Sequence, residues 1–151
     1  MSIYDLIRSD HSKLNGLFDQ LEQTSTHDEK KREKLFNELA EELTLHMRAE
    51  EDVLYFRLRD ADVTQDLIGE SCQEHHVVDV LLEELEDLPF TDEKWGPKLT
   101  LLRKNMEHHI QEEEDELFSK AGKTMSDEEA LLLAQELERA KERHRRPSQA
   151  A

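Results

Sequence analysis

The most constraining feature of this sequence is an internal repeat that keeps histidines and glutamates in register with apolar residues. Each half of the repeat holds one isolated histidine and, further on, a His-x3-Glu pair, and the two halves are 63 to 64 residues apart. The six repeated positions are His11, His46, Glu50, His75, His109 and Glu113. Leu14 and Phe18 after the first histidine correspond to Val78 and Leu82 in the second half. Such a repeat predicts two similar halves whose polar residues face each other.

The composition predicts an all-α fold with few, long helices. Charged residues make up 38% of the chain and hydrophobic residues 36%, and four glycines and three prolines leave little material for turns. β-branched runs are nearly absent, which argues against a sheet. Apolar residues at helical spacing predict helices over about 2–23, 29–59, 65–88, 98–120 and 126–146. Residues 1–120 are expected to form a bundle, 121–146 an additional C-terminal helix packed on or beside it, and 147–151 a tail.

The spacing of the histidines predicts how the first four helices are arranged. In an antiparallel pair of helices, residues equidistant from the turn lie at the same height, because both helices rise equally per residue. The positions midway between His11 and His46, between Glu50 and His75, and between His75 and His109 all fall inside predicted turns. The sequence therefore predicts an up-down-up-down four-helix bundle with the four histidines at one level.

The residue types at that level point to a metal centre. In each His-x3-Glu pair both side chains face the same way, and that face is also the apolar one. A carboxylate directed at a core needs a partner, which a metal ion supplies. Imidazole with carboxylate is the donor set of di-iron and di-manganese centres. The competing interpretation is a set of buried His–Glu hydrogen bonds, with the isolated histidines satisfied by backbone carbonyls.

Residues next to the six candidates are expected to have other roles. Asp79, one turn after His75, is a possible further metal ligand. Alternatively, it accepts a hydrogen bond from one of the residues that bind the metal. Most acids in the runs 50–52 and 112–116 are expected to lie in the solvated face, and Glu51 or Glu114 would reach a metal only as substitutes. Cys72 is expected to be a buried, inert thiol.

Two pairs of neighbouring residues are also assigned from helical geometry. His76 and His108 point about 100° away from the candidates, so they are expected to be exposed or to support the ligands from outside. Tyr55 and Phe118 follow the two glutamates at matched positions and are expected to close the core.

Charge and cysteine content narrow the classes of partner. The formal net charge of −17 repels phosphate backbones, so nucleic acid is not an expected partner. No stretch approaches about 18 uncharged apolar residues, so no membrane span is expected. The N-terminus is polar within a few residues, and the lone cysteine cannot form an intrachain disulfide. These features predict a cytoplasmic protein.

With these residues in place, the chain resembles the hemerythrin-like HHE cation-binding family over roughly residues 1–120. The resemblance implies a non-haem centre of two iron ions, bridged by Glu50, Glu113 and an oxo or hydroxo group. It implies that His11 and His46 bind one iron and that His75 and His109 bind the other, with manganese or zinc as substitutes. It also implies a small ligand, either dioxygen, peroxide or nitric oxide. The chain is expected to act as a monomer or homodimer.

One departure from the family pattern affects the expected activity. Oxygen-carrying hemerythrins have a fifth histidine four residues after the one matching His75, where this chain has Asp79. A more oxygen-rich donor set stabilises ferric iron, so turnover of peroxide, catalase-like or peroxidase-like, is expected over reversible oxygen carriage. This activity would belong to the cell's response to oxidative stress. The alternatives are an oxygen, nitric oxide or iron sensing module without turnover, and a plain helical scaffold.

Overall fold

The computed structural model describes the backbone of residues 1–150 and side chains as far as Arg145. Within that range the chain is helical and contains no strand, so the all-α prediction is confirmed. The elements in chain order are α1 (Ile3–Glu22), α2 (Glu29–Glu50), η1 (Glu51–Tyr55), α3 (Phe56–Leu58), α4 (Gln65–Asp87), α5 (Trp95–Glu112), η2 (Glu113–Leu117), α6 (Phe118–Ala121) and α7 (Asp127–Ala150). None of the described helices is long and apolar enough to cross a membrane.

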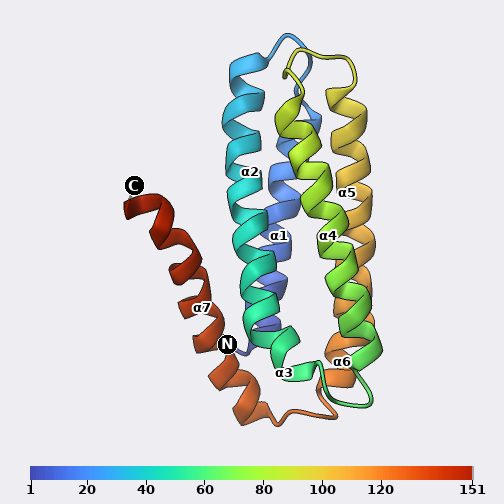
Figure 1. Ribbon diagram of the computed structural model, residues 1–151, viewed down its shortest axis with the longest axis vertical. Helices are drawn as coiled ribbons and strands as arrows, with labels where there is room; N and C mark the ends of the chain where they lie inside the picture. Colours follow the sequence, from blue (N-terminus) through green and yellow to red (C-terminus); the bar gives the residue numbers. More distant parts are fainter. Residues whose placement is uncertain (151) are drawn as a thin grey trace.

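Figure 1 shows α1, α2, α4 and α5 side by side, with helices that are consecutive in the chain running in opposite directions. The α1–α2 and α4–α5 connections lie at one end of this group, and α3 and α6 lie at the other. The last helix, α7, runs along the outside and packs on α1 and α2. In this arrangement, residues from both halves of the repeat come together near the middle of α1, α2, α4 and α5.

The helix boundaries follow local chemistry, with two departures from the prediction. Ser2 caps α1, because its Oγ accepts the Asp5 N–H at 3.3 Å while Asp5 Oδ2 accepts the Ser2 N–H at 3.0 Å. Helix α5 starts at Trp95, three residues earlier than expected, since a proline in the first turn of a helix lacks only a donor that has no partner there. Helix α7 continues to Ala150, past the predicted end near Pro147. Ala151, in the predicted tail, lies outside the described residues.

Two of the long helices contain one π-helical segment each, which the sequence pattern did not predict. Segment η1 starts immediately after Glu50, and segment η2 starts at Glu113. In a π-helix the backbone N–H bonds to the carbonyl five residues back instead of four. The residue five positions after each glutamate is therefore turned toward the face that the glutamate occupies.

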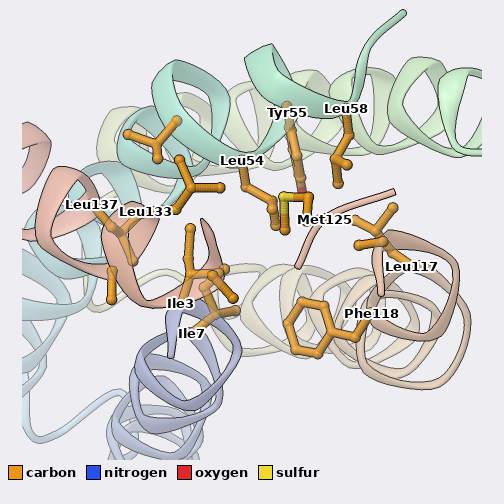
Figure 2. Close-up of a cluster of buried hydrophobic side chains, with 14 of the residues drawn as sticks. Ile3, Ile7, Leu54, Tyr55, Leu58, Leu117, Phe118, Met125, Leu133 and Leu137 are labelled. Carbon is orange, nitrogen blue, oxygen red and sulfur yellow. The ribbon is translucent and has the colours of Figure 1, made fainter. Parts of the chain in front are cut away.

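The apolar core is divided into two clusters on either side of the polar level. One cluster lies toward the α1–α2 and α4–α5 connections and includes Phe18, Phe36 and Trp95. The other lies toward α3 and α6 and includes the inner face of α7. Figure 2 shows this second cluster, in which Ile3, Leu54 and Leu133 converge from three different helices. The histidines and glutamates of the repeat lie between the clusters, on α1, α2, α4 and α5 and at the start of η2.

Arg32 joins the two connections at the first end of the bundle. Its side chain is 5% exposed and donates to Thr24 Oγ1 at 2.9 Å, to the Thr24 carbonyl at 3.2 Å and to the Phe90 carbonyl at 2.8 Å. The guanidinium also lies 4.8 Å from the centre of the Trp95 ring. One buried cation thus satisfies carbonyls from both turns.

Candidate metal centre

The six residues of the repeat are all buried and come together from four helices. None of them is more than 2% exposed. His11 comes from α1, His46 and Glu50 from α2, His75 from α4, and His109 from α5, with Glu113 at the start of η2. Their placement on the inner, apolar face agrees with the faces read from the helical spacing.

The side chains form two groups whose ligand atoms converge. In the first group, one donor atom from each of His11, His46, Glu50 and Glu113 lies within 4.8 Å of all the others. The His11 Nε2–Glu113 Oε1 distance is 3.2 Å, and the His46 Nε2–Glu50 Oε1 distance is 3.1 Å. Imidazole nitrogens and carboxylate oxygens therefore meet at one point.

The second group shares Glu50 with the first. It contains Glu50, His75 and His109, again with donor atoms within 4.8 Å of one another. His75 Nε2 lies 3.3 Å from Glu50 Oε1 and 3.2 Å from His109 Nε2, and His109 Nε2 lies 3.5 Å from Glu113 Oε2. Both glutamates thus lie between two pairs of histidines.

Several of these atoms have no hydrogen-bond partner among the described residues. They are His11 Nε2, His46 Nε2, Glu50 Oε2 and Glu113 Oε1. The contact between His11 and Glu113 is short enough for an ion pair but lacks the geometry of a hydrogen bond. Buried polar atoms without partners are costly, and a cation bound at this point would satisfy all four. The donor set fits a pair of metal ions of the iron, manganese or zinc type.

The Nδ1 atom of each of the four site histidines lies against a carboxylate. His11 Nδ1 lies 2.7 Å from Glu114 Oε2, and His75 Nδ1 lies 2.7 Å from Glu51 Oε2. The same arrangement recurs on the other two histidines, with His46 Nδ1 3.0 Å from Asp10 Oδ2 and His109 Nδ1 2.7 Å from Glu74 Oε1. A carboxylate at Nδ1 keeps the proton there, so that the Nε2 lone pair faces the centre.

These four carboxylates obey the internal repeat. Asp10 and Glu74 each precede an isolated histidine, and Glu51 and Glu114 each follow a glutamate of a His-x3-Glu pair. Glu51 and Glu114, expected at most as substitute metal ligands, instead lie half-buried against the imidazoles of His75 and His11. Their matched places in the repeat were the signal that could have identified them.

The pKa values of the buried groups reflect this mixture of charges. Burial lowers the pKa of His46, but the carboxylates of Glu50 and Asp10 outweigh it and raise the pKa to about 10. Burial raises the pKa of Glu113, yet its close contacts with the imidazoles of His109 and His11 bring it well below its ordinary value. The carboxylates therefore favour positive charge at the imidazole positions, which a bound cation also supplies.

Comparison with known proteins assigns the chain to a family. Residues 2–121 match the hemerythrin HHE cation-binding domain. The chain belongs to this family. Its fold is shared with the crystal structure of a hemerythrin HHE cation-binding domain-containing protein from Mycobacterium kansasii, with a TM-score of 0.86 and 24% identity over 99% of this chain and 91% of that one. The hemerythrin-like resemblance expected from the histidine pattern is thereby confirmed.

Two relatives with sequence similarity differ in length from this chain. A DNA nickase from Nostoc sp. is 32% identical over 145 residues, which cover 93% of this chain and 39% of the nickase. An uncharacterized hemerythrin-like protein from Schizosaccharomyces pombe is 28% identical over 141 residues, which cover 92% of this chain and 68% of that protein. The HHE chain thus spans well under half of the first relative and about two thirds of the second.

Tyr55 lies at the centre of the HHE site rather than only closing the core. Its hydroxyl donates to Glu113 and lies 3.2 Å from His109 Nε2 and 3.4 Å from His75 Nε2. Five residues along an α-helix from Glu50 would leave its side chain about 140° away, so α-helical spacing could not place it there. The wider π-helical turn of η1 directs the Tyr55 side chain toward the site. Burial, with the carboxylates of Glu113 and Glu50, raises the pKa of Tyr55 well above its ordinary value.

The second half of the repeat lacks this hydroxyl. Phe118 occupies the matching position five residues after Glu113 and packs on Tyr4, with ring centres 4.9 Å apart. Phe118 therefore closes the core as expected. The two halves of the site differ in polarity at this one position.

The remaining candidates near the HHE site lie outside it. Asp79 contacts the Arg48 guanidinium, which also donates to Glu51 at 2.7 and 3.0 Å, and Asp79 is in neither group of converging atoms among the described residues. His76 and His108 are exposed, as expected. Cys72 is exposed, so the prediction of a buried thiol is wrong. The inward position beside it on α4 is taken by Ser71.

Proposed function

We propose that this chain is a non-haem di-iron protein that reacts with small oxidants, hydrogen peroxide first among them. The observation that carries the proposal is the pair of converging donor groups that share Glu50. They contain four buried atoms that have no hydrogen-bond partner among the side chains and backbone that the structure describes. The membership of the chain in a cation-binding family supports the same conclusion. Iron fits the donor set, and manganese or zinc would be accepted as substitutes.

Two pairs of histidines and two shared glutamates would bind the two ions. His11 and His46 would hold one ion, His75 and His109 the other, and Glu50 with Glu113 would lie between them. When bound, the ion pair supplies redox chemistry and polarises a small oxygen-containing ligand. The carboxylates at Nδ1 fix the orientation of each imidazole and increase its basicity. Asp79 is outside this ligand set, because its carboxylate pairs with Arg48.

Tyr55 and the surrounding apolar residues would control what reacts. With its raised pKa, the Tyr55 phenol keeps its proton and acts as a hydrogen-bond donor to Glu113. That hydroxyl lies on the His75 and His109 side, so one side of the site carries a proton donor and the other does not. Buried Leu14 and Phe18 exclude bulk water, which favours ligands with two non-hydrogen atoms.

Metal content and peroxide consumption test the proposal. The full chain, loaded with ferrous iron and then oxidised, is expected to bind two iron ions, to absorb in the near ultraviolet and to consume hydrogen peroxide. The variant His109→Ala is expected to lose at least one ion and most of the consumption. His76→Ala, which removes an exposed histidine on α4, is the matched control and is expected to behave as wild type. Equal peroxide consumption in wild type and His109→Ala would refute the proposed reaction.

A sensing module without turnover is the second candidate function. The observation that favours it is that α7 contacts residues beside the proposed ligands, since His144 pairs with Asp52 at 2.7 Å and Lys141 contacts Asp10. Stoichiometric iron binding with no peroxide consumption, together with altered amide exchange in α7 on reduction, would favour sensing over turnover.

DNA is not part of the proposed function. The name of the Nostoc relative describes a protein of which this chain covers 39%. A net charge of −17 opposes contact with phosphates. The chain is therefore expected to leave the electrophoretic mobility of duplex DNA unchanged at physiological salt and to produce no nicks in a supercoiled plasmid.

A further inference from the structure

The inner face of α7 ends in a lysine that reaches toward the proposed metal centre. Ala130, Leu133, Ala134, Leu137 and Ala140 are buried against the bundle. Lys141 lies one turn after Leu137 on the same face. Its ammonium contacts the Asp10 carboxylate, and the two side chains are only 24% and 19% exposed. The ion pair is thus formed at the edge of the core, where it is partly shielded from water.

Asp10 connects this lysine to a proposed ligand. The oxygen that Lys141 contacts, Oδ2, is the one that lies 3.0 Å from His46 Nδ1. Lys141, Asp10 and His46 therefore form a continuous line from the outer helix to the first group of converging atoms. The Asp10 carboxylate thus lies between the Lys141 ammonium and the His46 imidazole.

The matching carboxylate in the other half of the repeat has no such support. Glu74 holds His109 in the way that Asp10 holds His46. Among the described side chains Glu74 pairs with no lysine or arginine, and its other ionic neighbour is the exposed His108 at 3.8 Å. The matched carboxylates Asp10 and Glu74 therefore differ in their cationic partners, just as the matched positions of Tyr55 and Phe118 differ in polarity.

We propose that Lys141 is a positioning residue for the metal centre, acting through Asp10 on His46, so that α7 tunes one of the two ion positions. This inference rests on the proposed di-iron function. The lysine holds Asp10 in place as the acceptor for the Nδ1 proton, which keeps His46 Nε2 directed at its ion. The ammonium also withdraws negative charge from Asp10 and so limits the basicity of the imidazole.

Two consequences follow for a variant that lacks the ammonium. Loss of orientation at one ligand weakens one ion position, and supporting residues of this kind typically change metal affinity by about 10- to 100-fold. Loss of a nearby positive charge stabilises ferric over ferrous iron, so the reduction potential of the centre falls. A role for Lys141 in packing alone would produce neither a selective loss of one ion nor a directed change in potential.

The experiment compares Lys141→Met and Lys141→Arg with wild type, each as the full chain loaded anaerobically with ferrous iron. We expect Lys141→Met to release one of its two ions to a ferrous chelator roughly tenfold faster, to release the second at the wild-type rate, and to show a lower reduction potential. The arginine variant restores the charge and is expected to restore slow release. Arg145→Met removes a cation from the same helix, where it pairs with Glu42 at 3.8 Å, and is expected to leave both rates unchanged.

A double-mutant cycle tests whether the lysine acts through Asp10. In an Asp10→Asn background, Lys141→Met is expected to add no further change in the release rates. Identical release and potential in wild type and Lys141→Met, with two ions bound in each, would overturn the inference and leave the proposed function standing. Failure of the wild-type chain to bind iron would refute the proposed function and this inference together.

Discussion

At the scale of single residues, the site depends on carboxylates that touch imidazoles rather than solvent. Asp10, Glu51, Glu74 and Glu114 each hold the Nδ1 of one histidine. The six candidate ligand positions could be predicted because helical spacing placed them on the apolar face. Residue type alone could not separate the four outer carboxylates from solvated acids, because a chain with net charge −17 has many acidic residues, and only their matched places in the repeat distinguish them.

Neutralising one outer carboxylate is expected to weaken metal binding. Glu114→Gln removes the negative charge that holds the His11 Nδ1 proton, so we expect metal affinity to fall by about 10-fold or more. Competition between the protein and a chelator of known affinity measures the change. Glu116→Gln, an exposed residue of the same η2 segment, is the matched control. An unchanged affinity in Glu114→Gln would show that this contact does not support the ligand.

Removing the Tyr55 hydroxyl is expected to reduce stability. Tyr55→Phe loses a hydrogen bond to a buried carboxylate, so the free energy of unfolding of the metal-free chain should fall by about 1–3 kcal/mol. Urea denaturation monitored by circular dichroism measures it. Tyr4→Phe is the control, because the Tyr4 hydroxyl is buried with no hydrogen-bond partner in the described part of the chain and its removal should cost almost nothing. Equal losses in the two variants would contradict a special role for Tyr55.

At the scale of helices, the π-helical segments decide which residues enter the site. Segments η1 and η2 follow matched glutamates, and the residue five positions on is Tyr55 in one and Phe118 in the other. The existence and direction of the long helices could be predicted from their apolar stripes and turns. The π turns could not, because an apolar pattern read at 3.6 residues per turn carries no sign of one wider turn.

The α1–α2 and α4–α5 connections are joined by one buried arginine, Arg32. Arg32→Met leaves the Thr24 and Phe90 carbonyls without their donor, so we expect the free energy of unfolding to fall by about 2–3 kcal/mol. Chemical denaturation of the metal-free chain measures this loss. The control Arg59→Met removes an exposed guanidinium that lies 4.1 Å from the Phe56 ring and should cost less than about 1 kcal/mol.

At the scale of the whole molecule, a polar layer separates two apolar clusters. The clusters contain the largest buried side chains, including Trp95 on one side and Tyr55 on the other. The arrangement of the first four helices followed from the repeat and the turn positions. The manner in which α7 reaches Asp10 could not be predicted, because Lys141 lies in a run of basic residues that resembles an ordinary helix end.

Metal removal is expected to lower the stability of the entire chain. A ligand that binds only the folded state stabilises it by about 4 kcal/mol at a free concentration 1,000 times its dissociation constant. We therefore expect the thermal midpoint of the iron-loaded chain to fall on addition of a chelator, as measured by scanning calorimetry. His109→Ala should show a much smaller shift, and equal shifts would indicate that the chelator acts elsewhere.

The position of the polar layer between two apolar clusters also determines how the site is connected to the surface. Buried Leu and Phe side chains pack on both sides of the layer and close the bundle along its long axis. A groove between α2 and α4 is lined by Arg48 and Asp79, and Arg48 there donates to Glu51, the carboxylate that holds His75. Ionic contacts at the side of the bundle thus continue inward, through Glu51, to the polar layer.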